Sequence, residues 1–160
     1  MTAALNELTD LVGRWVGEGQ GQWPADPPLR YGEEVVFAAT GKPFLAYRQR
    51  TWALTDGRGL HAETGYLRAT SAGEVELVVV QPTGFAEIHV GRRVHAELDL
   101  RLLHLSRTPT AAPVTDVHRH FTITANTLAY RLSIAMNGEP LADHLQAQLH
   151  REVEPAAADG

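Results

Sequence analysis

Six residues at alternate positions constrain the fold of this chain more than any other feature. They are Gly13, Trp15, Gly17, Gly19, Gly21 and Trp23. Successive side chains of a strand point to opposite faces, so this spacing places all six on one face of an extended segment. Four glycines leave that face bare between two indoles, which indicates a close approach by another main chain or by a ligand. A crowded barrel strand and a flat ligand lying against the strand both explain the pattern.

The chain after Gly13 keeps a period of two and predicts about ten short strands. The expected ranges are 13–23, 32–39, 44–54, 61–69, 74–81, 85–91, 93–104, 115–123, 127–136 and 142–152. Turn residues separate them, and Asn137-Gly138 is typical of a two-residue hairpin. Before Gly13, apolar residues at helical spacing predict a short amphipathic helix over 3–12, with Thr2 as its N-cap. We therefore expect an all-β fold, an antiparallel up-and-down β-barrel with a short N-terminal helix, and a sandwich is the alternative.

Composition indicates one compact domain over residues 1–153 and a small polar tail, 154–160, that we expect to be disordered. The chain of 160 residues has no cysteine, which excludes disulfides and thiolate metal sites. No signal peptide and no apolar run of about 20 residues is evident, so we expect a cytoplasmic location and no membrane partner. The formal net charge of −5 argues against a nucleic-acid partner.

Six blocks of sequence resemble the nitrobindin family. They are GRWVGEGQGQWP (13–24), EEVVF (33–37), GKPFL (41–45), LHAETGYLR (60–68), GFAEIHVG (84–91) and PLADHL (140–145). The resemblance extends over roughly residues 8–151. It implies a barrel similar to the fatty-acid-binding proteins, which holds heme b, binds nitric oxide and isomerises peroxynitrite to nitrate at ferric heme. We count a homodimer among the possible assemblies.

The resemblance also implies roles for individual residues. His144 matches the proximal ligand of the heme iron, which makes it the expected metal-binding and catalytic residue. His61 resembles a residue on the distal side of the heme, and Leu60 would help to wall that side. Gly17 and Gly19 are expected to leave room for the cofactor. In a regular strand His144 would share a face with polar residues, so either the lumen is polar there or a β-bulge near Asp143 turns the side chain inward.

Two departures from the family pattern bear on how the porphyrin would be held. Nitrobindins often carry a threonine where this chain has Ala25, and a lysine in the block that contains Ala112. Without these polar groups an arginine elsewhere would have to compensate. The candidates are Arg30, Arg48, Arg50, Arg68 and Arg119.

Two other classes of function stay open at this point. A non-catalytic carrier of a small apolar ligand would use the same barrel, with an arginine in the lumen to anchor a carboxylate. A purely structural or interaction module is the third alternative, with the irregular segment 108–115 at its edge.

Two histidines stand apart from the expected heme site. His118 and His120 flank Arg119, and in a strand both would share one face. Residues two apart in a strand are able to chelate a metal, but the sequence identifies no third ligand. Two surface histidines are therefore the favoured interpretation over a zinc site.

Overall fold

The structure, a computed structural model, describes residues 7–22, 27–70 and 73–153. Ten strands make up almost all of it. They are β1 (Gly13–Gly21), β2 (Leu29–Lys42), β3 (Phe44–Ala53), β4 (Gly59–Ala69), β5 (Glu74–Gln81), β6 (Phe85–Val94), β7 (Glu97–Arg107), β8 (Val114–Ile123), β9 (Thr127–Met136) and β10 (Ala142–Arg151). A single 3-10 turn, η1 (Thr9–Leu11), precedes them within the described residues.

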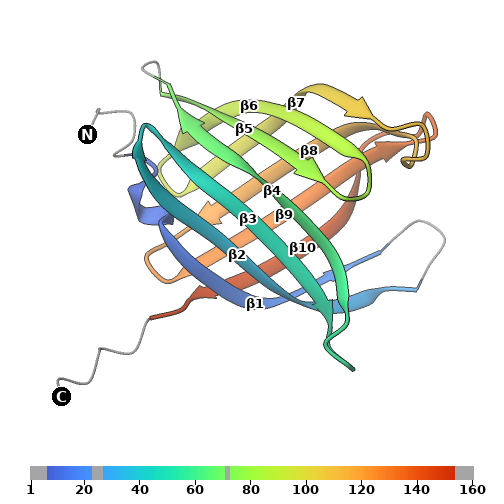
Figure 1. Cartoon of the computed structure of the whole chain (residues 1–160), viewed down its shortest axis with the longest axis horizontal. Helices are drawn as coiled ribbons and strands as arrows, with labels where there is room; N and C mark the ends of the chain where they lie inside the picture. Colours follow the sequence, from blue (N-terminus) through green and yellow to red (C-terminus); the bar gives the residue numbers. More distant parts are fainter. Residues whose placement is uncertain (1–6, 23–26, 71–72, 154–160) are drawn as a thin grey trace.

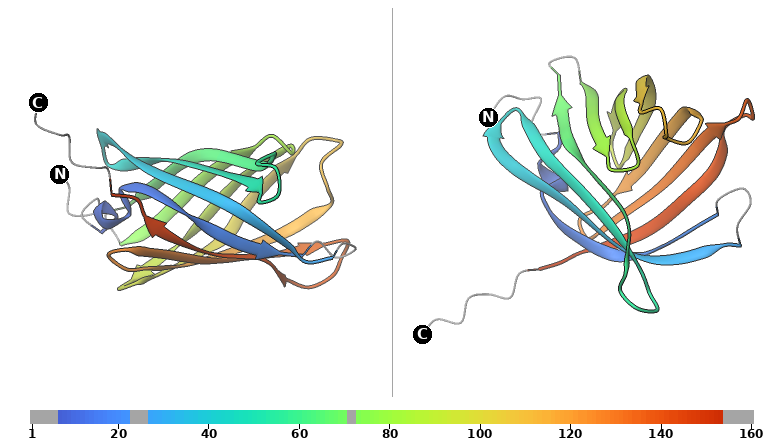
Figure 2. Two further views of the ribbon diagram at one scale, coloured as in Figure 1. Left: turned by 90° about the horizontal axis from the view of Figure 1, so that it is seen from below. Right: turned by 45° about the vertical axis from the view of Figure 1, so that its right-hand side comes forward.

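The strands close into an up-and-down antiparallel barrel. Each strand pairs with its neighbours in sequence, and β1 pairs with β10 to complete the ring (Figure 1). Figure 2 shows the strands tilted around a common axis, as closure of a sheet into a barrel requires. The predicted all-β barrel of about ten strands is therefore confirmed. Among the described residues, no helix has the length and apolar character to cross a bilayer.

The bare glycine face of β1 lies where the ring closes. Gly17 is opposite Leu149 of β10, and a Cβ placed on Gly17 would lie 2.3 Å from the main-chain oxygen of Gln148. A Cβ placed on Gly19 would lie 2.4 Å from the ring of Tyr31. These two glycines thus let a neighbouring main chain and an aromatic ring approach β1 closely.

The start of the chain differs from the predicted helix over 3–12. Thr2 and residues 3–6 lie outside the described residues, and the described remainder is a three-residue 3-10 turn. The indole N–H of Trp15 donates a 2.9 Å hydrogen bond to the main-chain oxygen of Leu11. The chain then turns directly into β1 at Gly13, whose φ of 141° suits glycine. Tertiary contacts with the barrel therefore replace a further helical turn.

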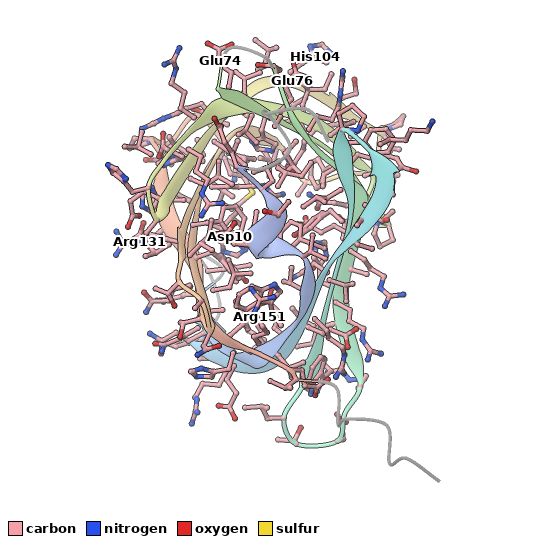
Figure 3. The ribbon with its side chains drawn as sticks, turned by 90° about the vertical axis from the view of Figure 1, so that its left-hand side faces the viewer. Asp10, Glu74, Glu76, His104, Arg131 and Arg151 are labelled. Atoms are coloured by element: carbon pink, nitrogen blue, oxygen red, sulfur yellow. The ribbon has the colours of Figure 1, made fainter. Side chains whose placement is uncertain are left out.

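η1 covers one end of the barrel. Leu8, Leu11 and Trp15 are fully buried there and join the apolar core. The guanidinium of Arg151 lies 4.1 Å from the centroid of the Trp15 ring and donates to the main-chain oxygen of Val12. Figure 3 looks onto this end, with Asp10 of the turn and Arg151 of β10 inside the outline of the barrel. The opposite half of the lumen is hollow and holds the candidate site.

Most strand boundaries agree with the sequence to within two residues, but β2 extends three residues beyond its predicted range at each end, and the turn between β6 and β7 is misplaced. The sequence predicts a strand from 93 to 104, whereas β6 continues to Val94 and β7 begins at Glu97. The intervening turn includes His95 with a φ of 54°, a left-handed conformation that histidine adopts uncommonly. Because this turn has no glycine, proline or asparagine, the sequence does not signal it.

Candidate functional site

A cavity of about 580 Å³ occupies the half of the lumen that lies away from η1. This volume lies within the roughly 300–1,000 Å³ that is usual for small-molecule sites. The residues at its rim include Gly21, Leu60, His61, Ala112, His144 and Leu145. Deeper in the cavity, its wall includes Glu33, Gln49, Glu63, Glu87, Arg119 and Tyr130. The site therefore combines an apolar entrance that carries two histidines with a polar interior.

A β-bulge brings His144 to this cavity. The register between β10 and β9 shifts between Asp143 and Leu145, so His144 is the extra residue. Both His144 and Leu145 consequently line the cavity, although they are adjacent in the chain. Of the two explanations that the sequence allowed, the β-bulge near Asp143 is present and accounts for the orientation of His144.

The imidazole of His144 is held by the main chain at the end of β1. Its Nδ1 lies 3.0 Å from the main-chain oxygen of Gln22. Because a carbonyl oxygen only accepts hydrogen bonds, Nδ1 carries the proton and the lone pair of the neutral ring is on Nε2. Burial lowers the pKa of His144, which keeps the ring neutral at pH 7. A neutral imidazole with its second nitrogen held by a carbonyl is the arrangement found in metal-ligating histidines.

His61 and Leu60 lie together at the start of β4, and both line the cavity. Burial lowers the pKa of His61, so its ring is neutral at pH 7. Its Nε2 lies 4.0 Å from Oε2 of Glu63, deeper in the lumen. A positive charge on His61 would disfavour protonation of His144. This repulsion is one cause of the lowered pKa of His144. The two histidines therefore line the same cavity and lie close enough to interact electrostatically.

A buried ionic network centred on Arg119 fills the wall of the cavity. Arg119 donates to both carboxylate oxygens of Glu63, at 2.7 and 3.1 Å, and to Glu87 at 2.8 Å. Tyr47 donates to Glu63 at 2.6 Å, and His89 lies 2.8 Å from Glu87 through Nε2. All five residues are buried. Charges removed from water in this way require close partners, which the network supplies.

The network determines the charge state of its two glutamates. Burial acts to raise the pKa of Glu87, but hydrogen bonds from His89 and Arg119 hold it at about 2. Burial acts in the same direction on Glu63, and the charge and hydrogen bonds of Arg119 lower its pKa instead. The pKa of Arg119 is raised because both carboxylates favour its charged form against burial. The three groups are thus ionised at neutral pH.

Glu33 is the exception among the interior glutamates. Gln49 donates to its Oε1 at 3.0 Å and Tyr130 donates to its Oε2 at 2.7 Å, but no cation is among its hydrogen-bond donors in the described residues. Burial raises the pKa of Glu33 to about 7, and Glu63 adds to the rise. The hydroxyl of Tyr31 lies 3.0 Å from that of Tyr130 and extends the chain of polar groups. The cavity therefore includes a carboxyl group that gains or loses its proton near neutral pH.

The other residues singled out from the sequence lie in different places. Ala112 lines the cavity, while Ala25 lies outside the described residues. Gly17 and Gly19 contact β10 and Tyr31, as described above, and the cavity is lined by Gly21 of the same strand. Among the five candidate arginines only Arg119 is buried. The others, Arg30, Arg48, Arg50 and Arg68, are exposed.

Sequence analysis missed the inward-facing glutamates. Glu33 alternates with Val35 and Phe37, which are buried, and Glu87 alternates with the buried His89. A carboxylate in phase with an apolar strand face was the signal that could have identified them. Arg119, the partner of Glu63 and Glu87, carried the same signal, because it lies between the buried Val117 and Phe121.

The residues around the cavity fit a heme group. His144 offers a nitrogen ligand from the rim with its tautomer set by Gln22, and apolar side chains such as Leu60 and Leu145 surround it. Imidazole nitrogen is a common axial ligand of heme iron. The donor set and the apolar rim therefore agree with the group that the sequence resemblance implies.

Comparison with known proteins supports the same conclusion. The sequence model of the THAP4-like, heme-binding β-barrel domain matches residues 4–151. Peroxynitrite isomerase 2 of Mycobacterium marinum is 45% identical over 152 residues, which cover 92% of this chain and 94% of that protein. Peroxynitrite isomerase 1 of Mycobacterium tuberculosis is 45% identical over 159 residues, which cover 95% and 97%.

A solved structure extends the agreement to three dimensions. The crystal structure of Rv2717c from M. tuberculosis superposes with a TM-score of 0.88 at 44% sequence identity, covering 96% of this chain and 99% of that one. The sequence match, the closed ten-stranded barrel and the histidine at its rim agree with one another. The chain belongs to the family of THAP4-like, heme-binding β-barrel domains, which is the nitrobindin family that its sequence resembles.

Proposed function

We propose that this chain binds heme b through His144 and isomerises peroxynitrite to nitrate, as its relatives' names describe for them. The observation that carries the proposal is the hydrogen bond from His144 Nδ1 to the oxygen of Gln22, made by a neutral imidazole at the rim of a 580 Å³ cavity. The 45% identity to two peroxynitrite isomerases over more than nine-tenths of the chain supports the reaction. We further propose a cytoplasmic location.

Each residue at the rim has a defined task in this proposal. When bound, heme supplies an iron centre at which peroxynitrite rearranges to nitrate and to which nitric oxide binds. His144 donates its Nε2 lone pair, and Gln22 keeps the ring oriented. His61 presents a neutral, polar ring to the side where the small ligand is held, and Leu60 excludes water beside it. Conversion of the peroxynitrite anion to the nitrate anion moves an oxygen and no proton, so no catalytic acid or base is required.

The alternative of a carboxylate carrier has less support. Such a carrier needs an unengaged cation in the lumen to anchor its ligand. Arg119 is the buried arginine, and it already binds Glu63 through both terminal nitrogens and Glu87 through Nη2. The two glutamates already balance the charge of Arg119, so a ligand carboxylate would add a third negative charge beside it, and only its buried Nε lacks a hydrogen-bond partner among the described residues.

The test is a titration of the heme-free protein with hemin, followed by visible absorption. We expect a saturable Soret band for the wild type, and at least a tenfold loss of affinity for His144→Ala because the iron loses its axial ligand. His150→Ala is the matched control, since His150 is an exposed histidine of the same strand. If His144→Ala and His150→Ala bind hemin equally, the assignment of the axial ligand is wrong.

The reaction is tested separately by stopped-flow decay of peroxynitrite with measurement of the nitrate yield. We expect hemin-loaded wild type to accelerate the decay and to raise the nitrate yield. His61→Ala should retain its hemin affinity within about twofold and change the decay rate, because His61 faces the small ligand. A hemin-loaded protein that leaves the decay unchanged would refute the reaction and leave the heme site intact.

A further inference from the structure

The outer wall of the barrel carries a cluster of metal-ligating side chains that is separate from the cavity. His118 and His120 of β8 and Asp99 of β7 place one ligand atom each within 4.8 Å of one another. The alternation of β8 directs both histidines outward, whereas Arg119 between them is buried in the lumen. Asp99 lies directly opposite His120 in the pairing of β7 with β8. The structure thus supplies the third ligand that the sequence could not identify.

The distances within this cluster are close to those of a coordination sphere. Oδ1 of Asp99 lies 2.6 Å from Nε2 of His118 and 3.2 Å from Nδ1 of His120. Ligand atoms about 2.0–2.1 Å from a tetrahedral zinc ion lie roughly 3.3 Å apart. The distance from Asp99 to His120 already matches this value, and the distance from Asp99 to His118 would have to widen by about 0.7 Å to admit the ion.

Each ring nitrogen of His120 faces a carboxylate oxygen. Its Nε2 lies 2.7 Å from Oε2 of Glu97, while its Nδ1 faces Asp99. A neutral imidazole has only one N–H, so with a proton on Nε2 the Nδ1 lone pair would face a carboxylate oxygen. A metal ion bound between Nδ1 and Asp99 would take up that lone pair and remove this repulsion.

The groups around the cluster favour the metal ion. Glu97 and His120 form the carboxylate–histidine pair that commonly orients a metal-ligating imidazole. Thr122 donates to the same Glu97 oxygen at 2.9 Å and fixes its position. Arg101 lies 3.4 Å from Oδ2 of Asp99, the oxygen that does not face the histidines. Glu97 and Thr122 thus hold His120 in a ligating orientation, whereas the positive charge of Arg101 beside Asp99 opposes the ion.

We propose that Asp99, His118 and His120 bind a divalent first-row transition metal ion, with Zn²⁺ as the representative ion, on the outer face of β7 and β8. Two imidazoles and one carboxylate suit Zn²⁺, Ni²⁺, Co²⁺ or Cu²⁺, whereas Mg²⁺ and Ca²⁺ require mainly oxygen ligands. Three protein ligands leave the fourth position to water.

The ion would join the shortest seam of the barrel. β7 and β8 share five registered residue pairs, and every other pair of neighbouring strands shares at least six. A metal ion held by Asp99 on one strand and two histidines on the other would cross-link this seam. We therefore assign the ion a stabilising role, independent of the heme at the rim.

The experiment is calorimetric titration of Zn²⁺ into untagged full-length protein that has been stripped of metal with a chelator. We expect one ion per chain with micromolar affinity and a rise in the melting temperature. Asp99→Asn and His118→Ala should each weaken binding at least tenfold. Asp99→Asn preserves the shape of the side chain, so it carries the test if the alanine variant does not fold.

Two controls separate this site from the other histidines. His104→Ala changes an exposed histidine of β7 outside the cluster and should bind Zn²⁺ as the wild type does. His144→Ala, which removes the expected iron ligand at the rim, should also retain the site. Failure of the wild type to bind at 1 mM Zn²⁺, or equal weakening by His104→Ala and Asp99→Asn, would overturn the proposal.

Discussion

Substitution of Gly17 by alanine tests whether the bare face of β1 exists to let the barrel close. The added Cβ would lie 2.3 Å from the main-chain oxygen of Gln148 and 2.9 Å from Cα of Leu149, whereas ordinary contacts begin near 3.4 Å. Since both opposing atoms belong to the main chain, no side-chain rotation relieves the clash. β1 and β10 must therefore separate by about 1 Å at this point, a distance estimated from the shortfall in contact.

The expected cost follows from two effects. Overpacking of a well-packed site costs about 1–3 kcal/mol. Stretching the two main-chain hydrogen bonds nearest to Gly17 costs about 1 kcal/mol each. The lower backbone entropy of alanine in the unfolded chain returns about 0.4–1 kcal/mol. We therefore expect Gly17→Ala to lower the free energy of unfolding by about 2–5 kcal/mol.

Urea denaturation of the heme-free protein measures this loss without any contribution from a bound ligand. Gly59→Ala is the matched control, because Gly59 is also a strand glycine and a Cβ placed there meets nothing within 4 Å. We expect the control to change the free energy of unfolding by less than about 1 kcal/mol in either direction. Equal stabilities of the two variants would refute the closure argument and leave the ligand as the reason for the bare face.

Two further predictions concern the buried polar groups. Arg119→Met should lower the free energy of unfolding by about 3–5 kcal/mol, because it leaves the carboxylates of Glu63 and Glu87 buried without their cation. Arg68→Met, which removes an exposed ion pair, should lower it by less than about 1 kcal/mol in the same urea assay. Similar losses for the two variants would contradict this reasoning. Glu33 has a folded-state pKa of about 7 against an unfolded value of 4.5, so its protonated form favours the folded state and its contribution to stability is lost as pH rises through 7. Relative to Glu33→Gln, the wild type should lose about 2.5 kcal/mol between pH 5 and pH 8, and parallel stability curves for the two proteins would show that Glu33 is not protonated in the fold.

The sequence was a good guide to most strands, because alternation marks them and turn residues separate them, with the turn between β6 and β7 as the exception. Asn137 and Gly138 have positive φ angles of 57° and 81°, as the hairpin signal predicted. The β-bulge beside Asp143 was one of two explanations that the sequence allowed for a histidine out of phase with its apolar neighbours, the other being a polar lumen face. The choice of His144 as candidate iron ligand came from the family resemblance, and its local pattern alone would not have distinguished it from other strand histidines.

The remaining features depend on contacts between distant segments. Trp15 holds η1 over the end of the barrel by donating a hydrogen bond to the main-chain oxygen of Leu11. Helical periodicity in the sequence does not predict such a contact. The ion pair of Arg119 with Glu63 joins residues 56 positions apart. The cluster of Asp99 with His118 depends on the register of β7 against β8. Such pairings become visible only when the order and register of the strands are known.

The cap that η1 places over one end of the barrel gives the cavity the form of a cup. Whatever enters the lumen by way of the cavity does so across the rim that carries His61, His144 and Ala112. A flat molecule seated at that rim would act as a stopper, with the polar groups around Arg119 and Glu33 enclosed beneath it. The rate at which the enclosed polar groups exchange protons with the solvent would then depend on how often the bound molecule moves away from the rim.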